Sequence, residues 1–147
     1  MSVPHPGGDP NANLYYQLKR DVLDRVPEIT RVTFEPDRAE ATTLEATFDP
    51  DRLGLDTGFE APRLTIAWYR QTPADWFQVD YSDPNSGFHA GWHQDGDHPE
   101  IGETHFQYTE AGRTVHRAIT FERETPSMIL WEIIEHLLSD VISLHRG

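Results

Sequence analysis

Four of the chain's eight histidines lie within the twenty residues GFHAGWHQDGDHPEIGETHF, which span positions 87 to 106. Imidazole suits two kinds of chemistry, because it ligates divalent metals and exchanges protons near neutral pH. His89 and His93 have the spacing of helical zinc ligands, but their alternation with aromatic and small residues indicates a strand. Four strand residues span roughly 13 Å, so we do not expect these two imidazoles to ligate one metal ion directly.

His93, His98 and His105 form a more promising trio. The segment QDGDHPEIGE after the first of them contains an Asp-Gly pair and a proline, so the chain must turn there. A turn can bring His93 close to His98 or His105 across paired strands, and we expect two or three imidazoles to converge. The neighbouring carboxylates that could join them are Asp95, Asp97, Glu100 and Glu103.

Three interpretations of this trio stay open at the level of sequence, and the first is catalysis without metal. The imidazoles would then act as general acid and general base near neutral pH. Cleavage of RNA at the 2'-hydroxyl needs one base, one acid, and a cation or amide donors for the phosphate. The catalytic candidates are therefore His93, His98, His105 and Arg70, with Arg113 and Arg117 as further cations.

In the second interpretation, the same trio and Asp97 bind a divalent ion such as zinc or manganese through nitrogen and oxygen atoms. The chain has no cysteine, which excludes disulfides and thiolate zinc sites, so any metal must rely on imidazole and carboxylate. The acid/base interpretation needs no cofactor. In the third interpretation, the segment is a polar loop with exposed histidines.

The charge of the chain is unusual in kind as well as in size. There are 25 Asp and Glu residues against 12 Lys and Arg, a formal net charge of -13, and Lys19 is the single lysine. This composition resembles that of proteins from salt-loving archaea, in which molar salt screens the repulsion between like charges. Most carboxylates are therefore expected to lie on the surface and bind water. In ordinary buffer the charge argues against nucleic-acid binding, an objection that weakens in molar salt.

The sequence predicts a soluble, cytoplasmic protein without a membrane partner. It has no apolar run long enough to span a membrane, and its start lacks the basic and apolar stretches of a signal peptide. Three prolines and two glycines among the first dozen residues predict a flexible tail over 1–12. A single domain is expected over 13–147.

Hydrophobic periodicity within that domain predicts a helix, six or seven strands and a closing helix. Asn11 or Asn13 caps the first helix, which Pro27 ends. The predicted strands lie at 28–36, 39–50, 63–70, 75–82, 86–94, 103–110 and 113–122, with a loop at 51–62. Because most connections are hairpins, we expect an α+β fold, an antiparallel sheet with N- and C-terminal helices packed on one face.

The closing helix is expected to begin with Thr125 as its cap and Pro126 in its first position. Its main apolar stripe contains Leu130, Ile133, Ile134, Leu137, Leu138 and Val141. Four further apolar residues lie off that stripe, namely Ile129, Trp131, Ile142 and Leu144. Either the helix is tucked deeply against the sheet, or a second apolar face binds a partner or forms a homodimer.

A longer pattern lies within residues 60–142, from WFQVDYSDPNSGFHAGWHQDGDHPEIGETHFQY to ETPSMILWEIIEHLLSDV. It contains an aromatic strand, a turn, a second aromatic strand that leads into a histidine segment, and a capped C-terminal helix. In this order of features it resembles the small TumE-like toxin family, whose members carry an HHPE segment and another histidine cluster. The matching pieces are Phe77 to Tyr81, Trp92, DHPEIGETHF and the helix from Pro126; Asp97 replaces one histidine, and Phe106 and Gln107 stand where others are expected.

The resemblance implies a toxin encoded beside a DNA-binding antitoxin that neutralises it, with growth inhibition through RNA or another nucleic-acid target. Three hypotheses follow, a metal-independent RNase-like toxin, a metal-dependent hydrolase and a non-enzymatic domain that binds a protein. Replacing His98 with alanine should abolish toxicity in the first case. A chelator should abolish activity in the second, and Ile142→Asp should break a complex in the third.

Overall fold

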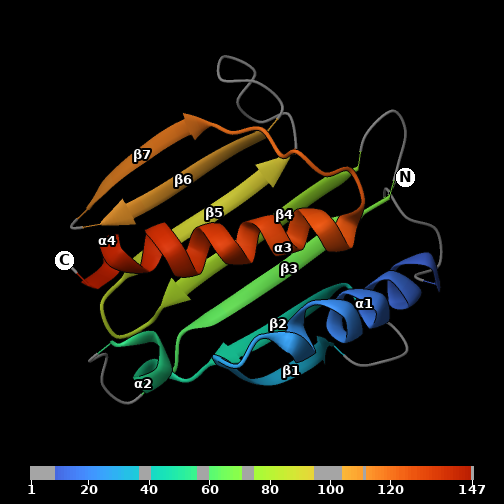
Figure 1. The fold of residues 1–147 in the computed structure, drawn as a ribbon, viewed down its shortest axis with the longest axis horizontal. Helices are drawn as coiled ribbons and strands as arrows, with labels where there is room; N and C mark the ends of the chain where they lie inside the picture. Colours follow the sequence, from blue (N-terminus) through green and yellow to red (C-terminus); the bar gives the residue numbers. More distant parts are fainter. Residues whose placement is uncertain are drawn as a thin grey trace.

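The strands form one seven-stranded antiparallel sheet whose spatial order equals the chain order, β1 to β7 (Figure 1). The computed structural model describes residues 9–36, 41–55, 60–70, 75–94, 104–110 and 112–146. The strands are β1 Ile29–Glu35, β2 Thr43–Phe48, β3 Arg63–Tyr69, β4 Trp76–Asp83, β5 Phe88–Gln94, β6 Thr104–Glu110 and β7 Arg113–Ala118. The helices are α1 Asp9–Asp21, α2 Pro50–Leu53, α3 Pro126–His136 and α4 Ile142–Arg146.

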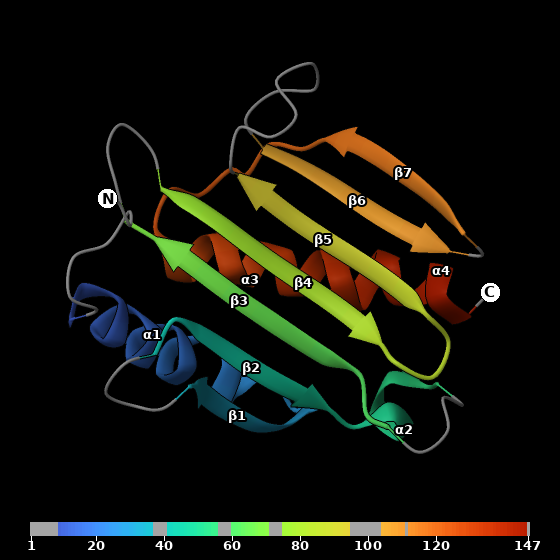
Figure 2. The ribbon, with the colours of Figure 1, turned by 180° about the vertical axis from the view of Figure 1, so that it is seen from behind.

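Helices α1 and α3 cover the same face of the sheet, α1 over β1 and β2 and α3 over the central strands (Figure 1). Side chains alternate accordingly. On β3, Leu64, Ile66 and Trp68 are buried beneath the helices, whereas Thr65 and Ala67 point the other way. Figure 2 shows this other side, which neither α1 nor α3 covers and which we call the open face. The predicted α+β fold, with both terminal helices on one face, is confirmed.

Helix α1 begins earlier than the sequence predicts. Residues 9–12, expected in the flexible tail, have helical backbone, and residues 1–8 lie outside the described part of the chain. Tyr15 ties α1 to the sheet, because its hydroxyl donates to the Thr42 carbonyl at 2.6 Å and accepts the Trp68 N–H at 3.1 Å. The hydroxyl thus bridges the strands where β2 and β3 cease to pair. Its burial raises the pKa of Tyr15 to about 12.

The short helix α2, Pro50–Leu53, overlaps the segment predicted as a loop over 51–62. The Asp49 carboxylate accepts the backbone N–H of Asp51 at 3.0 Å and caps the helix start. Gly54 ends the helix with a left-handed φ of 72°, which glycine adopts without steric cost. The loop prediction is therefore wrong at its beginning, and residues 56–59 lie outside the described ranges.

The C-terminal helix begins as predicted. Pro126 occupies its first turn, and the Thr125 hydroxyl accepts the backbone N–H of Met128 at 3.4 Å. A π-helical turn over Leu137–Val141 joins α3 to α4. In the ranges that the structure describes, no helix is both long enough and apolar enough to cross a membrane.

Most of the apolar residues that lie off the main stripe of this helix pack against the chain's own core. Ile129 and Ile142 are buried, and Trp131 is partly buried against the core, whereas Leu144 stays exposed. The hypothesis of a second apolar face for a partner or a homodimer is therefore wrong for Ile129 and Ile142, because both already pack inside the monomer. Ile142→Asp would damage the core instead of an interface.

Candidate functional site

The hairpin of β4 and β5 places a carboxylate between two histidines on the open face. A turn over 84–87 joins the strands, and its last residue, Gly87, has a left-handed φ of 77°. The register pairs Asp80 with Gly91, so Asp80 lies opposite the midpoint between His89 and His93. A carboxylate and two imidazoles are thus gathered by strand pairing alone.

Both imidazoles approach the same carboxylate oxygen. His93 Nε2 lies 2.7 Å from Asp80 Oδ1, and His89 Nε2 lies 3.4 Å from it. Gly91 supplies the space in which Asp80 and His93 meet, because a Cβ atom there would lie 2.5 Å from Asp80 Oδ1 and 2.8 Å from His93 Nε2. Any larger residue at this position would displace the carboxylate or the imidazole, so the glycine is part of the site.

His105 extends the cluster to β6. It pairs directly with His93, and the two rings meet edge to face with centroids 5.2 Å apart. His105 is only 1% exposed although it points to the open face, and the ring of His116 on β7 lies 6.3 Å from it. The structure therefore brings together two of the three predicted histidines. His98 and Asp97 lie outside the described residues.

Arg70 follows the end of β3 and binds a different carboxylate. Its Nε lies 2.9 Å from Asp75 Oδ2, which also accepts the indole N–H of Trp68 at 3.0 Å. The side-chain amide of Gln94 donates to the Asp75 carbonyl at 2.6 Å and ties this corner to β5. Arg70 is thus engaged by Asp75, and its role as a phosphate ligand stays a prediction.

Asp80 is the charged centre of the cluster. Burial raises the pKa of its carboxyl, but the hydrogen bonds and charges of His89 and His93 outweigh burial and hold it below the ordinary value. The carboxylate is therefore ionised at neutral pH. A carboxylate acceptor at Nε2 requires the imidazole proton there, which leaves Nδ1 as the atom that gains or loses a proton. The negative charge also stabilises an imidazolium once it forms.

The contact of His93 with Asp80 has the geometry of a hydrogen bond, whereas the contact of His89 with the same oxygen is longer, at 3.4 Å. Ligand atoms about 2.1 Å from a tetrahedral metal lie roughly 3.4 Å apart, whereas His93 Nε2 and Asp80 Oδ1 are 2.7 Å apart. Across the described ranges, no group of three or more metal-ligating side chains is arranged to hold an ion. The metal site predicted with His98 and Asp97 lies partly beyond those ranges and stays a prediction.

A second pair of histidine and carboxylate lies on the helix side of the same hairpin. His145 Nε2 is 3.0 Å from Asp83 Oδ2 and 3.1 Å from Ser86 Oγ. In a catalytic Ser-His-Asp arrangement, serine and aspartate bind different ring nitrogens, so that the imidazole can relay a proton. Here both bind Nε2, and Nδ1 faces the Tyr81 hydroxyl at 3.3 Å. This cluster therefore anchors α4 to the turn between β4 and β5.

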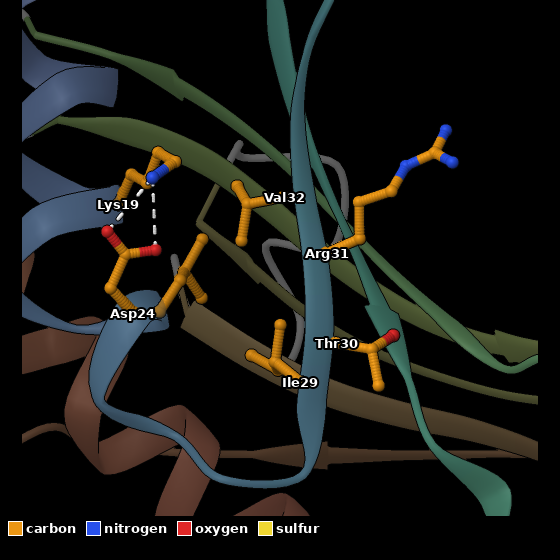
Figure 3. A pocket seen from close by; sticks show the side chains of 7 residues that line it. Lys19, Asp24, Ile29, Thr30, Arg31 and Val32 are labelled. Atoms are coloured by element: carbon orange, nitrogen blue, oxygen red, sulfur yellow. Dashed lines mark hydrogen bonds and ion pairs between the residues drawn. The ribbon is translucent and has the colours of Figure 1, made fainter.

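A surface hollow lies elsewhere, between the end of α1 and the edge strand β1 (Figure 3). Lys19 and Asp24 line one side, and the Lys19 ammonium donates to both oxygens of Asp24 at 3.1 and 2.9 Å. Ile29 and Val32 line the β1 side. The lining of this hollow holds no histidine, and its one carboxylate is already paired. We therefore place the candidate site on the open face.

Asp80 and His89 are absent from the residues that the sequence predicts for catalysis or metal binding. Asp80 is one of 25 acidic residues in a chain whose carboxylates are mostly expected to face solvent, so its type alone carries little information. The usable signal is the turn, because placing it at 84–87 puts Asp80 opposite Gly91. A glycine midway between two histidines on a strand then marks room for a facing side chain.

No protein-family model, curated protein or solved structure matches this chain. The fold and the site define an α+β protein with a histidine, aspartate and histidine cluster on the sheet face that neither α1 nor α3 covers. The resemblance to the TumE-like toxins is carried by the sequence motifs alone, and it stays a prediction.

Proposed function

We propose that the chain is a toxin that cleaves RNA by proton transfer without a metal ion, with His89 and His93 as acid and base around Asp80. The observation that carries this proposal is the 2.7 Å contact between His93 Nε2 and the ionised Asp80 carboxylate. Such a contact sets the tautomer and the orientation of an imidazole that moves a proton. Neither α1 nor α3 lies over the face that carries this contact (Figure 2).

The reaction needs two imidazoles in opposite protonation states. The neutral one takes the proton of a 2'-hydroxyl, whose oxygen forms a bond to the adjacent phosphorus. The bond from phosphorus to the 5'-oxygen breaks, and the protonated imidazole gives its proton to this leaving oxygen. The products are a 2',3'-cyclic phosphate and a 5'-hydroxyl. One negative charge, on Asp80, balances the one imidazolium that this scheme requires.

His105 is assigned a positioning role, which differs from the catalytic role predicted from the sequence. It is too deeply buried to meet a substrate, and its ring packs on that of His93. His105→Phe keeps an aromatic ring in this contact, so we expect it to retain the wild-type pH profile of cleavage. If His105 is itself the acid or the base, His105→Phe will instead abolish activity.

The test uses a DNA oligonucleotide with a single ribonucleotide, incubated in molar KCl with EDTA. Wild type should cut at the ribonucleotide and leave a cyclic phosphate, and His93→Gln and Asp80→Asn should each slow the reaction by about 100-fold or more. An all-DNA oligonucleotide should stay intact because it has no 2'-hydroxyl. Cleavage of all-DNA, or activity that needs a divalent ion, contradicts the mechanism, and the latter favours the metal-dependent hydrolase.

His145→Gln is the matched control for these substitutions. His145 also binds an aspartate of β4, but on the other face of the sheet. The variant should be less stable than wild type and should keep the wild-type rate per folded molecule. If folded His145→Gln and His93→Gln lose the same fraction of the wild-type rate, the loss in His93→Gln is no evidence for catalysis on the open face.

The toxin assignment is tested in a halophilic host. Expression of wild type should arrest growth and degrade RNA in the cytoplasm, and His93→Gln should do neither. The expected partner is a DNA-binding antitoxin, whose co-expression should restore growth. Arrest by both proteins would separate toxicity from this histidine cluster.

A further inference from the structure

Trp76 is exposed on the open face beside the histidine cluster. It begins β4 and is 46% exposed, whereas Trp68 and Trp92 are fully buried. Trp76 precedes Gln78 by two residues, and Gln78 pairs with His93, so Trp76 and His93 are diagonal neighbours across the two strands. Diagonal neighbours lie roughly 7–8 Å apart, within reach of an aromatic side chain.

Tyr69 of β3 pairs directly with Trp76, and strand alternation places both side chains on the open face. The backbone next to this aromatic pair is firmly held. The carboxylate of Asp75 binds Arg70, and the carbonyl of Asp75 accepts a hydrogen bond from Gln94 of β5. Stacking of a flat ligand on Trp76 therefore orders no further backbone at Asp75, which lowers its entropic cost.

The structure assigns Trp76, together with Tyr69, as a stacking subsite for a nucleobase of single-stranded RNA next to the bond that is cut. This inference rests on the proposed function. Any nucleobase can stack on an aromatic ring, and sheet-borne aromatic residues bind single-stranded RNA in this way. A net charge of -13 opposes binding through phosphates. Stacking does not depend on phosphate attraction, so it remains available in molar salt.

Binding is measured apart from cleavage, with a fluorescently labelled DNA oligothymidine in molar KCl, because DNA offers bases without the 2'-hydroxyl. Trp76→Ala should weaken binding about 10-fold, and Trp76→Phe should restore most of the affinity. Tyr16→Ala is the matched control, since Tyr16 is also 46% exposed but lies on α1. Equal affinities of wild type and Trp76→Ala would overturn the subsite.

Cleavage kinetics provide the second readout. Trp76→Ala should raise KM for the oligonucleotide with one ribonucleotide and leave kcat within about twofold, because the ring binds but moves no proton. A lower kcat at unchanged KM overturns the stacking role. If wild type binds oligothymidine through Trp76 but never cuts RNA, the proposed catalysis fails and the subsite stands. If RNA is cut equally well without Trp76, the subsite fails and the catalysis stands.

Discussion

Two aspartates three residues apart on β4 each bind a histidine, on opposite faces of the sheet. Asp80 points to the open face, where its side chain is 29% exposed and meets His93. Asp83 points to the helix side, where its side chain is 0% exposed and meets His145. The chemical groups are the same in both pairs. Because strand side chains alternate, an odd spacing sends one pair toward solvent and the other into the protein.

The partners of the two carboxylates show what each pair contributes. Asp83 also accepts the Asn85 backbone N–H at 3.0 Å and the Ser86 hydroxyl at 3.1 Å, so it closes the turn while it holds α4. Asp80 closes no turn, and it lies between two imidazoles over a glycine. A pair of histidine and carboxylate in this sequence is therefore not enough to predict a catalytic role. The prediction also needs the face of the sheet on which the pair lies.

The largest effect expected on stability is that of Asp83→Ala. The substitution removes the acceptor of Asn85 and Ser86 in the turn and leaves His145, whose side chain is 6% exposed, without its carboxylate. Breaking such a buried pair of histidine and aspartate costs about 3–5 kcal/mol. For a chain of this size, the melting temperature should fall by roughly 10 °C. Differential scanning calorimetry measures the change. The more exposed Asp80→Ala should cost clearly less, and equal losses would remove the contrast between the two pairs.

Gly91→Ala should have the opposite profile, with a large loss of activity and a smaller loss of stability. The new methyl group displaces the Asp80 carboxylate from His93, so RNA cleavage should fall about 100-fold, in the range expected for lost acid/base catalysis. Gly112→Ala is the control. Gly112 has open space around its Cβ position but a φ of 79°, so the substitution strains the turn without touching the site. Wild-type cleavage by Gly91→Ala would show that the Asp80 contact is dispensable.

Asp80→Asn tests the charge of the open-face pair through acid unfolding. The pKa of Asp80 lies below its ordinary value in the folded state, so the fold favours the ionised form. This contribution is present above the unfolded pKa, near 4, and is lost as pH falls through the folded pKa. The difference in unfolding free energy between wild type and Asp80→Asn should therefore shrink in urea titrations as pH falls below about 5. A constant difference would mean that Asp80 gains nothing from ionisation.

The sheet could be predicted because local pattern and tertiary structure agree. Each strand coincides with a predicted one to within a few residues. In segments such as TLEATF and RLTIAWY, the alternation of residue types matches the alternation of burial. Helix α2 was not predictable in this way, because four residues show no periodicity and only the Asp49 cap marks them. The early start of α1 was hidden by Pro10, which signals a break in most contexts but is tolerated in the first turn of a helix.

The candidate site was predictable in part. The turn signals after His93 correctly indicate that the chain folds back, and the register does pair His93 with His105. The role of Asp80 depends on the exact length of a different turn, and a one-residue change there would move it to the other face. Contacts between the sheet and the C-terminal helix, such as that of Trp92 with His136, join elements far apart in the chain and have no local signal.

That contact gives the smallest of the expected effects. The Trp92 indole N–H donates to His136 Nδ1 at 2.8 Å, which requires this nitrogen to be unprotonated. Burial lowers the pKa of His136, and the charge of Arg117 adds to this while Asp140 opposes it. The folded state thus favours neutral imidazole, so its stabilisation is present above the unfolded pKa, near 6.5, and is lost as pH falls through the folded pKa. Wild type should therefore lose more stability than His136→Gln between about pH 7.5 and pH 5.5.

Trp92→Phe separates this titration from the packing around it. Phenylalanine keeps an aromatic ring on β5 but removes the N–H donor, so protonation of His136 no longer breaks a hydrogen bond, and stability should depend less on pH. His136 lies on the helix side, as His145 does, and the proposed proton transfer occurs on the other face. The pH profile of RNA cleavage should thus be unchanged in His136→Gln. A shifted profile would place a titrating group of the reaction beneath the helices and contradict the assignment to the open face.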